Sequence, residues 1–179
     1  KIMDRKPPIN SSDPTGLQPE NVEGVFEFKN VVFAYPTKPH KQILKGVSFK
    51  IRKNEKTALV GESGCGKTTC IQLIERFYDI NEGSLTLDGN ELKDLNIKWL
   101  RSKIGYVGQE PVMFASSIKE NMLLAKEDAT EEEIWDALKH ANAADFVRQL
   151  PKQLDTYVGA GGTQLSGGQK QRLAIARAI

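Results

Sequence analysis

Nine consecutive residues in the first half of the chain carry the clearest chemistry. Residues 61–69 read Gly-Glu-Ser-Gly-Cys-Gly-Lys-Thr-Thr and fit the phosphate-binding pattern G-x-x-x-x-G-K-[ST] without a mismatch. Glycines let the backbone turn tightly and bring its N–H groups onto phosphate oxygens, where a Cβ would intrude. Lys67 supplies a positive charge for the β- and γ-phosphates, and Thr68 offers a hydroxyl to Mg²⁺. The predicted nucleotide-binding residues of this loop are Gly61, Glu62, Ser63, Gly64, Cys65, Gly66, Lys67, Thr68 and Thr69.

The residues on either side of this loop predict the elements that must position it. The apolar run 58–60 predicts a strand that leads into the loop, and residues 69–74 predict a helix that leaves it. The positive end of a helix dipole then faces the bound anion. A glycine-rich turn that matches the pattern by chance is the alternative, and the strand–loop–helix context argues against it.

Alternating apolar residues predict several strands. Residues 26–33 alternate with one shift of phase, and residues 47–51 alternate regularly, so both are expected to form half-buried antiparallel strands. Residues 84–89 predict a short strand followed by a turn, and residues 104–107 predict another strand.

Helical patterns dominate the second half of the chain. Thr130 and the three glutamates after it predict a helix cap with an acidic first turn, and the apolar residues that follow fall on one face. Further helices are expected over residues 143–150 and 169–178, separated by the glycine-rich segment 158–168.

Composition limits the class of protein. A chain of 179 residues with 39% hydrophobic and 27% charged residues predicts one soluble domain. Its net charge of +2 gives no argument for nucleic acid, and no apolar run approaches the ~20 residues that span a bilayer. Cys65 and Cys70 are the only cysteines, so a reducing compartment is expected. We interpret Cys65 as a small loop residue, the alternative being a thiol whose alkylation blocks nucleotide.

A second motif decides among the many classes of phosphate-loop protein. Residues 165–172 read Leu-Ser-Gly-Gly-Gln-Lys-Gln-Arg. With this motif the chain resembles the nucleotide-binding domain of an ATP-binding cassette (ABC) protein. In that family the motif caps the γ-phosphate of ATP held by a second such domain, in a head-to-tail dimer, and a plain helix cap is the alternative. The residues that the resemblance assigns to the partner's nucleotide are Leu165, Ser166, Gly167, Gly168 and Gln169.

Two further residues are assigned through the resemblance, which also implies the cofactors ATP and Mg²⁺. Tyr35 lies in a segment similar to the family's aromatic loop. Such a tyrosine alone would more often be a core or edge-strand residue, but beside the other motifs it is expected to stack on adenine. Gln109 lies in a segment similar to the glutamine loop, where it would bind Mg²⁺ or order a water molecule. Gln109 and Thr68 are thus the expected Mg²⁺ ligands, and Lys67 and Gln109 the expected catalytic residues. Ala160 departs from the family, which usually carries an acidic residue there.

The resemblance covers residues 25–179 and implies an α/β fold. We expect a P-loop NTPase, ABC-type ATPase domain with an antiparallel β subdomain, an α-helical subdomain at about 110–170, and the C-terminal core strands missing. Residues 1–24 are then expected to be a linker from a transmembrane domain. The segments most similar to the multidrug-exporter (P-glycoprotein-like) branch are residues 75–79, 99–101 and 110–114.

The resemblance implies a role at the cytosolic face of a membrane. ATP binding and hydrolysis would be coupled to export through the transmembrane domain of the same transporter, with no nucleic acid as partner. The sequence stops before the family's Asp-Glu pair, and His40 and His140 are interpreted as surface or packing residues. We therefore expect the chain to bind ATP, to be inactive alone, and to be only marginally stable. The alternatives are a non-hydrolysing nucleotide-binding module and a soluble ABC ATPase.

Overall fold

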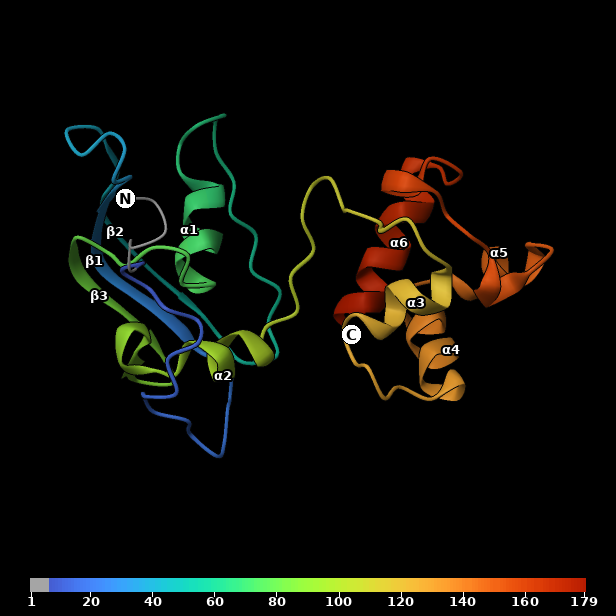
Figure 1. The fold of residues 1–179 in the computed structure, drawn as a ribbon. Helices are drawn as coiled ribbons and strands as arrows, with labels where there is room; N and C mark the ends of the chain where they lie inside the picture. The colour runs from blue at the N-terminus through green and yellow to red at the C-terminus, as the bar shows by residue number, and fades with distance from the viewer. Residues whose placement is uncertain (1–6) are drawn as a thin grey trace. The chain divides into compact units, whose positions relative to one another are not determined.

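The computed structural model describes residues 7–179, and these divide into two compact units. The first unit is Lys1–Ile104, of which residues 7–104 are described, and the second is Gly105–Ile179. Each unit has a hydrophobic core made from its own residues. Figure 1 shows strands and short helices in the first unit and helices only in the second.

The first unit is built on an antiparallel sheet with the strand order β2-β1-β3-β4. The strands are β1 (Phe26–Ala34), β2 (Gln42–Ile51), β3 (Glu82–Leu87) and β4 (Asn90–Glu91). Phe28 of β1 pairs with Phe49 of β2, and the two rings stack with centroids 4.3 Å apart. The strands predicted from alternation at 26–33, 47–51 and 84–89 are thereby confirmed.

The shift of phase in β1 has a structural cause. The pairing of β1 with both of its neighbours breaks between Phe28 and Val32, where Asn30 adopts a positive φ of 49°. This irregularity lets both Phe28 and Val31 face the core, where each is almost completely buried. Gly83 of β3 lies against the carbonyl of Asn30, and a Cβ at this position would collide with it.

Helix α1 (Lys67–Ile74) packs against this sheet through Cys70, Leu73 and Ile74 (Figure 1). Its C-terminal end is held by Arg101 of α2 (Ile97–Ser102), whose guanidinium donates to the carbonyls of Glu75 and Arg76 at 3.1 Å each. These bonds satisfy carbonyl groups that have no partner within the helix. The short helix η1 (Leu92–Asp94) connects β4 to α2.

The segment 13–25, called the strap below, is bonded to the first unit at several residues, and residues 13–24 of it belong to the predicted linker. Leu17 N–H donates to the Asp94 carbonyl at 2.8 Å, and Asn96 N–H donates to the Leu17 carbonyl at 2.9 Å, which forms an isolated parallel bridge. Further along, the carboxylate of Asp88 accepts the three backbone N–H groups of residues 23–25 at 2.8 to 3.2 Å. The strap is therefore attached at two points.

Asn96 is the central residue of the first attachment. Its side chain is buried, caps α2 by accepting from Trp99 N–H at 2.9 Å, and donates to the carbonyls of Asp13 and Thr15 at 3.2 and 2.9 Å. Gly16 has a φ of 105°, and a Cβ there would lie 2.6 Å from the Asn96 nitrogen. Only glycine fits this close approach without strain.

The second unit is a small helical assembly. Its elements are α3 (Ile118–Leu123), α4 (Glu131–His140), α5 (Ala144–Gln149), η2 (Gln153–Asp155), η3 (Ala160–Gly162) and α6 (Gly167–Ala178). Ile118, Leu138, Val147 and Leu173 are among its fully buried side chains, one from each α-helix. The helices predicted after Thr130, at 143–150 and at 169–178 are confirmed, and Thr130 forms a capping box with Glu133.

Two predicted strands are absent from the described residues, so both predictions were wrong. Residues 58–60 and 104–107 are extended segments without ladder partners, and Val60 is 91% exposed. A strand needs the N–H and C=O groups of a neighbouring strand, and none in the described part of the chain pairs with these runs. Their apolar character therefore indicates a preference for strand without determining the pairing.

Candidate nucleotide-binding site

The phosphate loop lies in the first unit, between the run 58–60 and the start of α1. Gly66 is the N-cap residue of α1 and has a φ of 104°, a left-handed conformation in which a side chain is strained. A Cβ on Gly66 would also lie 2.7 Å from Leu44 Cδ2 on β2. The sheet and the helix thus fix both the conformation and the position of this glycine.

No side chain caps the N-terminus of α1, and no acidic residue lies in its first turn. The first N–H groups of a helix have no partner within it, and they carry a partial positive charge. Thr68, in this first turn, is exposed, and Thr69 is buried. The end of α1 can therefore accept an anion without displacing a capping group.

Lys67 lies over its own loop. Its ammonium group donates to the carbonyls of Gly61 and Glu62 at 2.8 and 2.7 Å and lies 3.6 Å from Cys65 Sγ. These contacts place a positive charge beside the exposed Gly61 at the start of the loop. Carbonyl oxygens are neutral acceptors, so a phosphate oxygen would be a stronger partner for the same ammonium.

The two cysteines differ in environment. Cys65 is exposed within the loop, whereas Cys70 is buried in the core beneath α1. Burial, together with a smaller repulsion from Cys65, raises the pKa of the Cys70 thiol. The core thiol is thus the less reactive of the two.

Tyr35 lies directly after β1 and reaches α1. Its hydroxyl donates to Gln72 Oε1 at 2.7 Å and lies 2.9 Å from Thr69 Oγ1. The ring meets Phe33 and Tyr78 edge-on, with centroid distances of 5.0 and 5.2 Å. Tyr35 is half-buried, so the structure brings the predicted stacking residue close to the helix that the phosphate loop starts.

The remaining predicted residues lie in the second unit. Gln109 is exposed at a bend near the start of this unit. Ser166 is the N-cap residue of α6, and its capping box joins Ser166 Oγ to Gln169 N–H at 3.3 Å and Gln169 Oε1 to Ser166 N–H at 2.8 Å. Gly167 and Gly168 are exposed, and no atom lies within 4 Å of a Cβ built on either. Leu165 is buried in the helical core.

The capping box of α6 has a neutral residue where two other helices carry a charge. In α3 and α4 the third helical residue is Glu120 or Glu133, whereas in α6 it is Gln169. The first turn of α6 contains no acidic residue. This helix end is capped without a negative charge, which keeps it suitable for an anion.

Sequence reasoning missed one buried polar residue in the second unit. Asn121 is completely buried and accepts from the Phe114 N–H at 2.9 Å. Its amide nitrogen donates to the Phe114 carbonyl, to Ser116 Oγ and to the Ser117 carbonyl at 2.9 to 3.1 Å. These bonds fix the loop in which Phe114 is 55% exposed. An asparagine within an amphipathic helix gives no sequence signal for such a role.

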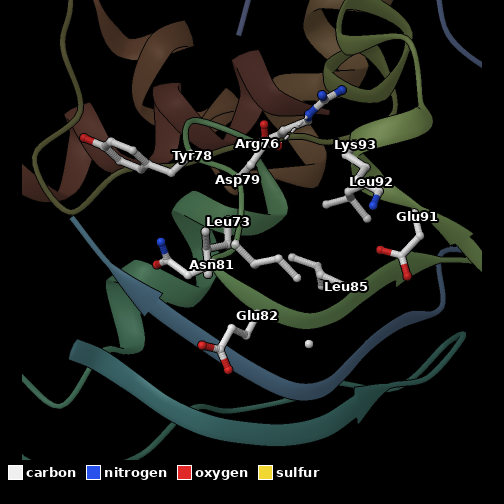
Figure 2. Close-up of a pocket in the computed structure, with 12 residues that line it drawn as sticks. Leu73, Arg76, Tyr78, Asp79, Asn81, Glu82, Leu85, Glu91, Leu92 and Lys93 are labelled. Atoms are coloured by element: carbon white, nitrogen blue, oxygen red, sulfur yellow. Dashed lines mark hydrogen bonds and ion pairs between the residues drawn. The ribbon is translucent and has the colours of Figure 1, made fainter. Parts of the chain in front are cut away.

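A cavity of about 150 Å³ in the first unit is lined by residues of α1, β3, β4 and η1 and of the segments next to them (Figure 2). Charged residues line it, but Arg76 already bonds Asp79 at 3.1 Å and the Leu95 carbonyl at 2.9 Å, and Glu91 accepts from Ser84. None of the residues predicted to bind nucleotide lines this cavity. We assign no ligand to it.

Metal and membrane features of residues 7–179 are limited. No group of three or more His, Cys, Asp or Glu side chains in this range is placed to hold a metal ion. No helix in the same range is long and apolar enough to cross a bilayer. Thr68 is exposed at the start of α1, and its hydroxyl is the kind of oxygen ligand that a phosphate-bound Mg²⁺ takes.

Comparison with known proteins gives consistent matches. A family profile described as "ABC transporter" matches residues 44–179. The chain is 55% identical over its whole length to "ABC transporter B family member 21" from Arabidopsis thaliana, and 52% identical, again over its whole length, to "Multidrug resistance protein 3" from Entamoeba histolytica. It spans only 14% of the length of each of these relatives.

A solved structure agrees with the sequence matches. It is described as "Structure of a bacterial Atm1-family ABC exporter with ATP bound" and superposes with a TM-score of 0.86 at 38% identity. The match covers 93% of this chain and 29% of that chain. The expected α/β fold of an ABC-type ATPase domain is confirmed by this match and by the family profile. The chain belongs to the ABC transporter family, as part of an ATP-binding domain of its exporter branch.

Proposed function

We propose that this chain binds Mg-ATP through its phosphate loop and serves as the ATP-binding part of an ABC exporter. The observation that carries the proposal is the start of α1, where an uncapped helix N-terminus, a left-handed Gly66 and the Lys67 ammonium lie together. Each of these features attracts or accommodates phosphate oxygens. The solved exporter that superposes on the chain is described with ATP bound, which supports the same ligand.

Within this proposal, Lys67 binds the β- and γ-phosphates, and backbone N–H groups of residues 64–69 surround them. Thr68 holds Mg²⁺ together with phosphate oxygens, and Gln109 is the second proposed protein ligand. The metal, when bound, offsets charge on the phosphates during phosphoryl transfer. Tyr35 stacks on the adenine ring.

The second unit contacts a nucleotide that is bound by another ABC domain. Ser166 and the N–H groups of Gly167 and Gly168 start a helix whose neutral capping residue Gln169 leaves the anion site uncharged. We propose that this end of α6 contacts the γ-phosphate of ATP bound by the partner domain, in a head-to-tail dimer. The relative named as an ABC transporter and the solved structure described as an ABC exporter support a transmembrane domain as the second partner and the cytosolic face of a membrane as the location.

The 179-residue chain is proposed to bind ATP without turning it over. Lys67, Thr68 and Gln109 provide charge and metal ligands, but phosphoryl transfer also needs a residue that orients or activates water. In the described part of the chain, Glu62 is the only acidic residue of the phosphate loop, and it is exposed. An ATPase assay that detects turnover by the purified chain, lost in Lys67→Ala, would contradict this part of the proposal.

A calorimetric titration with Mg-ATP tests the binding proposal directly. The wild-type chain is expected to bind, and Lys67→Ala is expected to lose binding because the loop then lacks its positive charge. Lys56→Ala is a matched control, since Lys56 is an exposed lysine outside the loop. Equal affinities for the wild type and Lys67→Ala would refute the proposed role of this loop.

A further inference from the structure

The hydroxyl of Tyr35 connects the segment after β1 to helix α1. It donates to Gln72 Oε1 at 2.7 Å, and Thr69 Oγ1 lies 2.9 Å away. A phenol has one proton to donate, so the Thr69 hydroxyl must be the donor in the second bond. Thr69 and Gln72 are three residues apart on α1 and therefore lie on the same face of the helix.

The position of the Tyr35 ring depends on the hydrogen bonds of its hydroxyl group, because the neighbouring rings restrain it only in part. Phe33 and Tyr78 touch the ring edge-on, with interplanar angles of 80° and 88°. Such edge-on contacts limit how the ring can tilt, but they do not stop it from shifting along its own long axis. The two hydrogen bonds at the tip supply that restraint, and part of the half-buried residue stays open to solvent.

Helix α1 also carries the phosphate loop at its start. Gly66 occupies the N-cap position without a capping side chain, Thr69 lies in the first turn, and Gln72 lies less than one turn later. The same rigid helix therefore positions the phosphate-binding groups and, through Gln72, the ring of Tyr35. A ligand with an aromatic base and a phosphate chain would contact both ends of this arrangement.

We propose that Gln72 is a positioning residue that orients Tyr35 for stacking on the base of a nucleoside triphosphate, with Thr69 as its second support. This inference rests on the proposed function, because it assumes that phosphates bind at the loop. It adds a specific role for Gln72, which lies outside the phosphate-binding motif. It also assigns a role to the Tyr35 hydroxyl, which a stacking contact alone does not need.

The test compares two probes by calorimetry, Mg-ATP and Mg-tripolyphosphate, which lacks the base. Tyr35→Phe and Gln72→Met each remove one side of the hydrogen bond and should weaken Mg-ATP about three- to tenfold, the usual value of one net hydrogen bond. Binding of Mg-tripolyphosphate should stay within about twofold, the usual additivity error. Tyr35→Ala sets the scale, with about a fivefold or larger loss of Mg-ATP affinity from lost stacking.

Two further variants separate orientation from simple structural damage. The double variant Tyr35→Phe/Gln72→Met should bind Mg-ATP no more weakly than Tyr35→Phe alone, because loss of the phenol already removes the bond to Gln72. Gln72→Glu keeps an acceptor for the phenol. Its ratio of Mg-ATP affinity to Mg-tripolyphosphate affinity should therefore be close to that of the wild type. Gln149→Met, at an exposed glutamine on α5, is the matched control.

The outcomes distinguish this inference from the proposal beneath it. If Lys67→Ala binds both probes as well as wild type, or if wild type binds neither, the proposed function fails and this inference fails with it. If Lys67→Ala loses both probes but Gln72→Met changes neither affinity, only the role of Gln72 is refuted. That role is refuted equally if Gln72→Met weakens both probes to the same extent, since the glutamine would then support α1 and not the base.

Discussion

At the scale of single residues, the two thiols provide a test of how the phosphate loop is presented. Cys65 is exposed in the loop and lies 3.6 Å from the Lys67 ammonium, while Cys70 is buried three residues into α1. Burial raises the pKa of the Cys70 thiol and keeps it as a poor nucleophile. Reactivity should therefore be confined to the thiol beside the proposed phosphate site.

We expect a maleimide to label the native chain once, at Cys65, and Cys65→Ser to abolish rapid labelling. Mg-ATP should slow the reaction because phosphates would cover the loop, and Lys67→Ala should remove this protection. Mass spectrometry of the labelled peptides distinguishes the two cysteines. Unchanged labelling in saturating Mg-ATP would contradict nucleotide binding next to Cys65.

At the scale of elements, the capping boxes of three helices differ in charge. Hydrogen bonds from Lys126 and then from the Thr130 backbone lower the pKa of Glu133 below its ordinary value of 4.5. Bonds from Ser117 lower the pKa of Glu120 in the same way. Carboxylates with a lowered folded-state pKa stabilise the fold above pH 4.5 and lose that contribution as the pH falls through the folded value. Gln169 in α6 has no such dependence.

The second unit is therefore expected to lose stability in acid through α3 and α4. The urea concentration at the unfolding midpoint of the wild type should decrease as the pH is lowered from about 7 to about 3.5. This decrease should be smaller in Glu133→Gln, which keeps the cap without the charge. Gln169→Glu should create new acid sensitivity at α6 by the same reasoning. An unchanged pH profile in Glu133→Gln would show that its carboxylate has the same pKa in the folded and unfolded chain.

The strap gives a second prediction at the element scale. Asn96→Ala removes both the cap of α2 and the two bonds to the strap, whereas Asn96→Ser keeps a capping oxygen but cannot reach the strap carbonyls. Asn96→Ser should expose the strap around residues 13–15 to proteases with little loss of stability, while Asn96→Ala should also cost about 0.5–2 kcal/mol. Limited proteolysis with mass spectrometry, beside urea unfolding, separates the two effects. Equal protease resistance in all three proteins would show that Asn96 does not hold the strap.

Much of this architecture could be predicted because it depends on local patterns. Alternation identified β1 and β2, capping residues identified α4, and the phosphate-loop and Leu165–Gln169 motifs identified the candidate site residues. The failures involve partners distant in sequence. Residues 58–60 and 104–107 have strand composition without a strand to pair with, and the attachment of the strap depends on Asn96, some 80 residues later. Periodicity carries no information about either kind of contact.

At the scale of the whole chain, two separate cores should produce two unfolding steps. Phe28, Phe33 and Leu73 belong to the core of the first unit, and Ile118 and Leu173 to that of the second. No residue is shared between these clusters in the described range 7–179. Cooperativity requires that loss of one core exposes the other, and separate clusters provide little of this coupling.

The two tryptophans report on the two units separately. Trp99 lies on α2 in the first unit, and Trp135 lies on α4 in the second, with the Arg148 guanidinium 5.2 Å from its ring. In urea, Trp99→Phe and Trp135→Phe variants should give different midpoints, each following the remaining tryptophan. Mg-ATP binds the folded first unit in this proposal, so at about 100 times its dissociation constant it should stabilise the Trp99 transition by about 2.7 kcal/mol. The Trp135 transition should shift less, because the phosphate loop is not part of that unit and Gln109 is the only proposed ligand of Mg-ATP that lies in it. A single coincident transition that shifts as a whole with Mg-ATP would show instead that the two cores unfold as one cooperative structure.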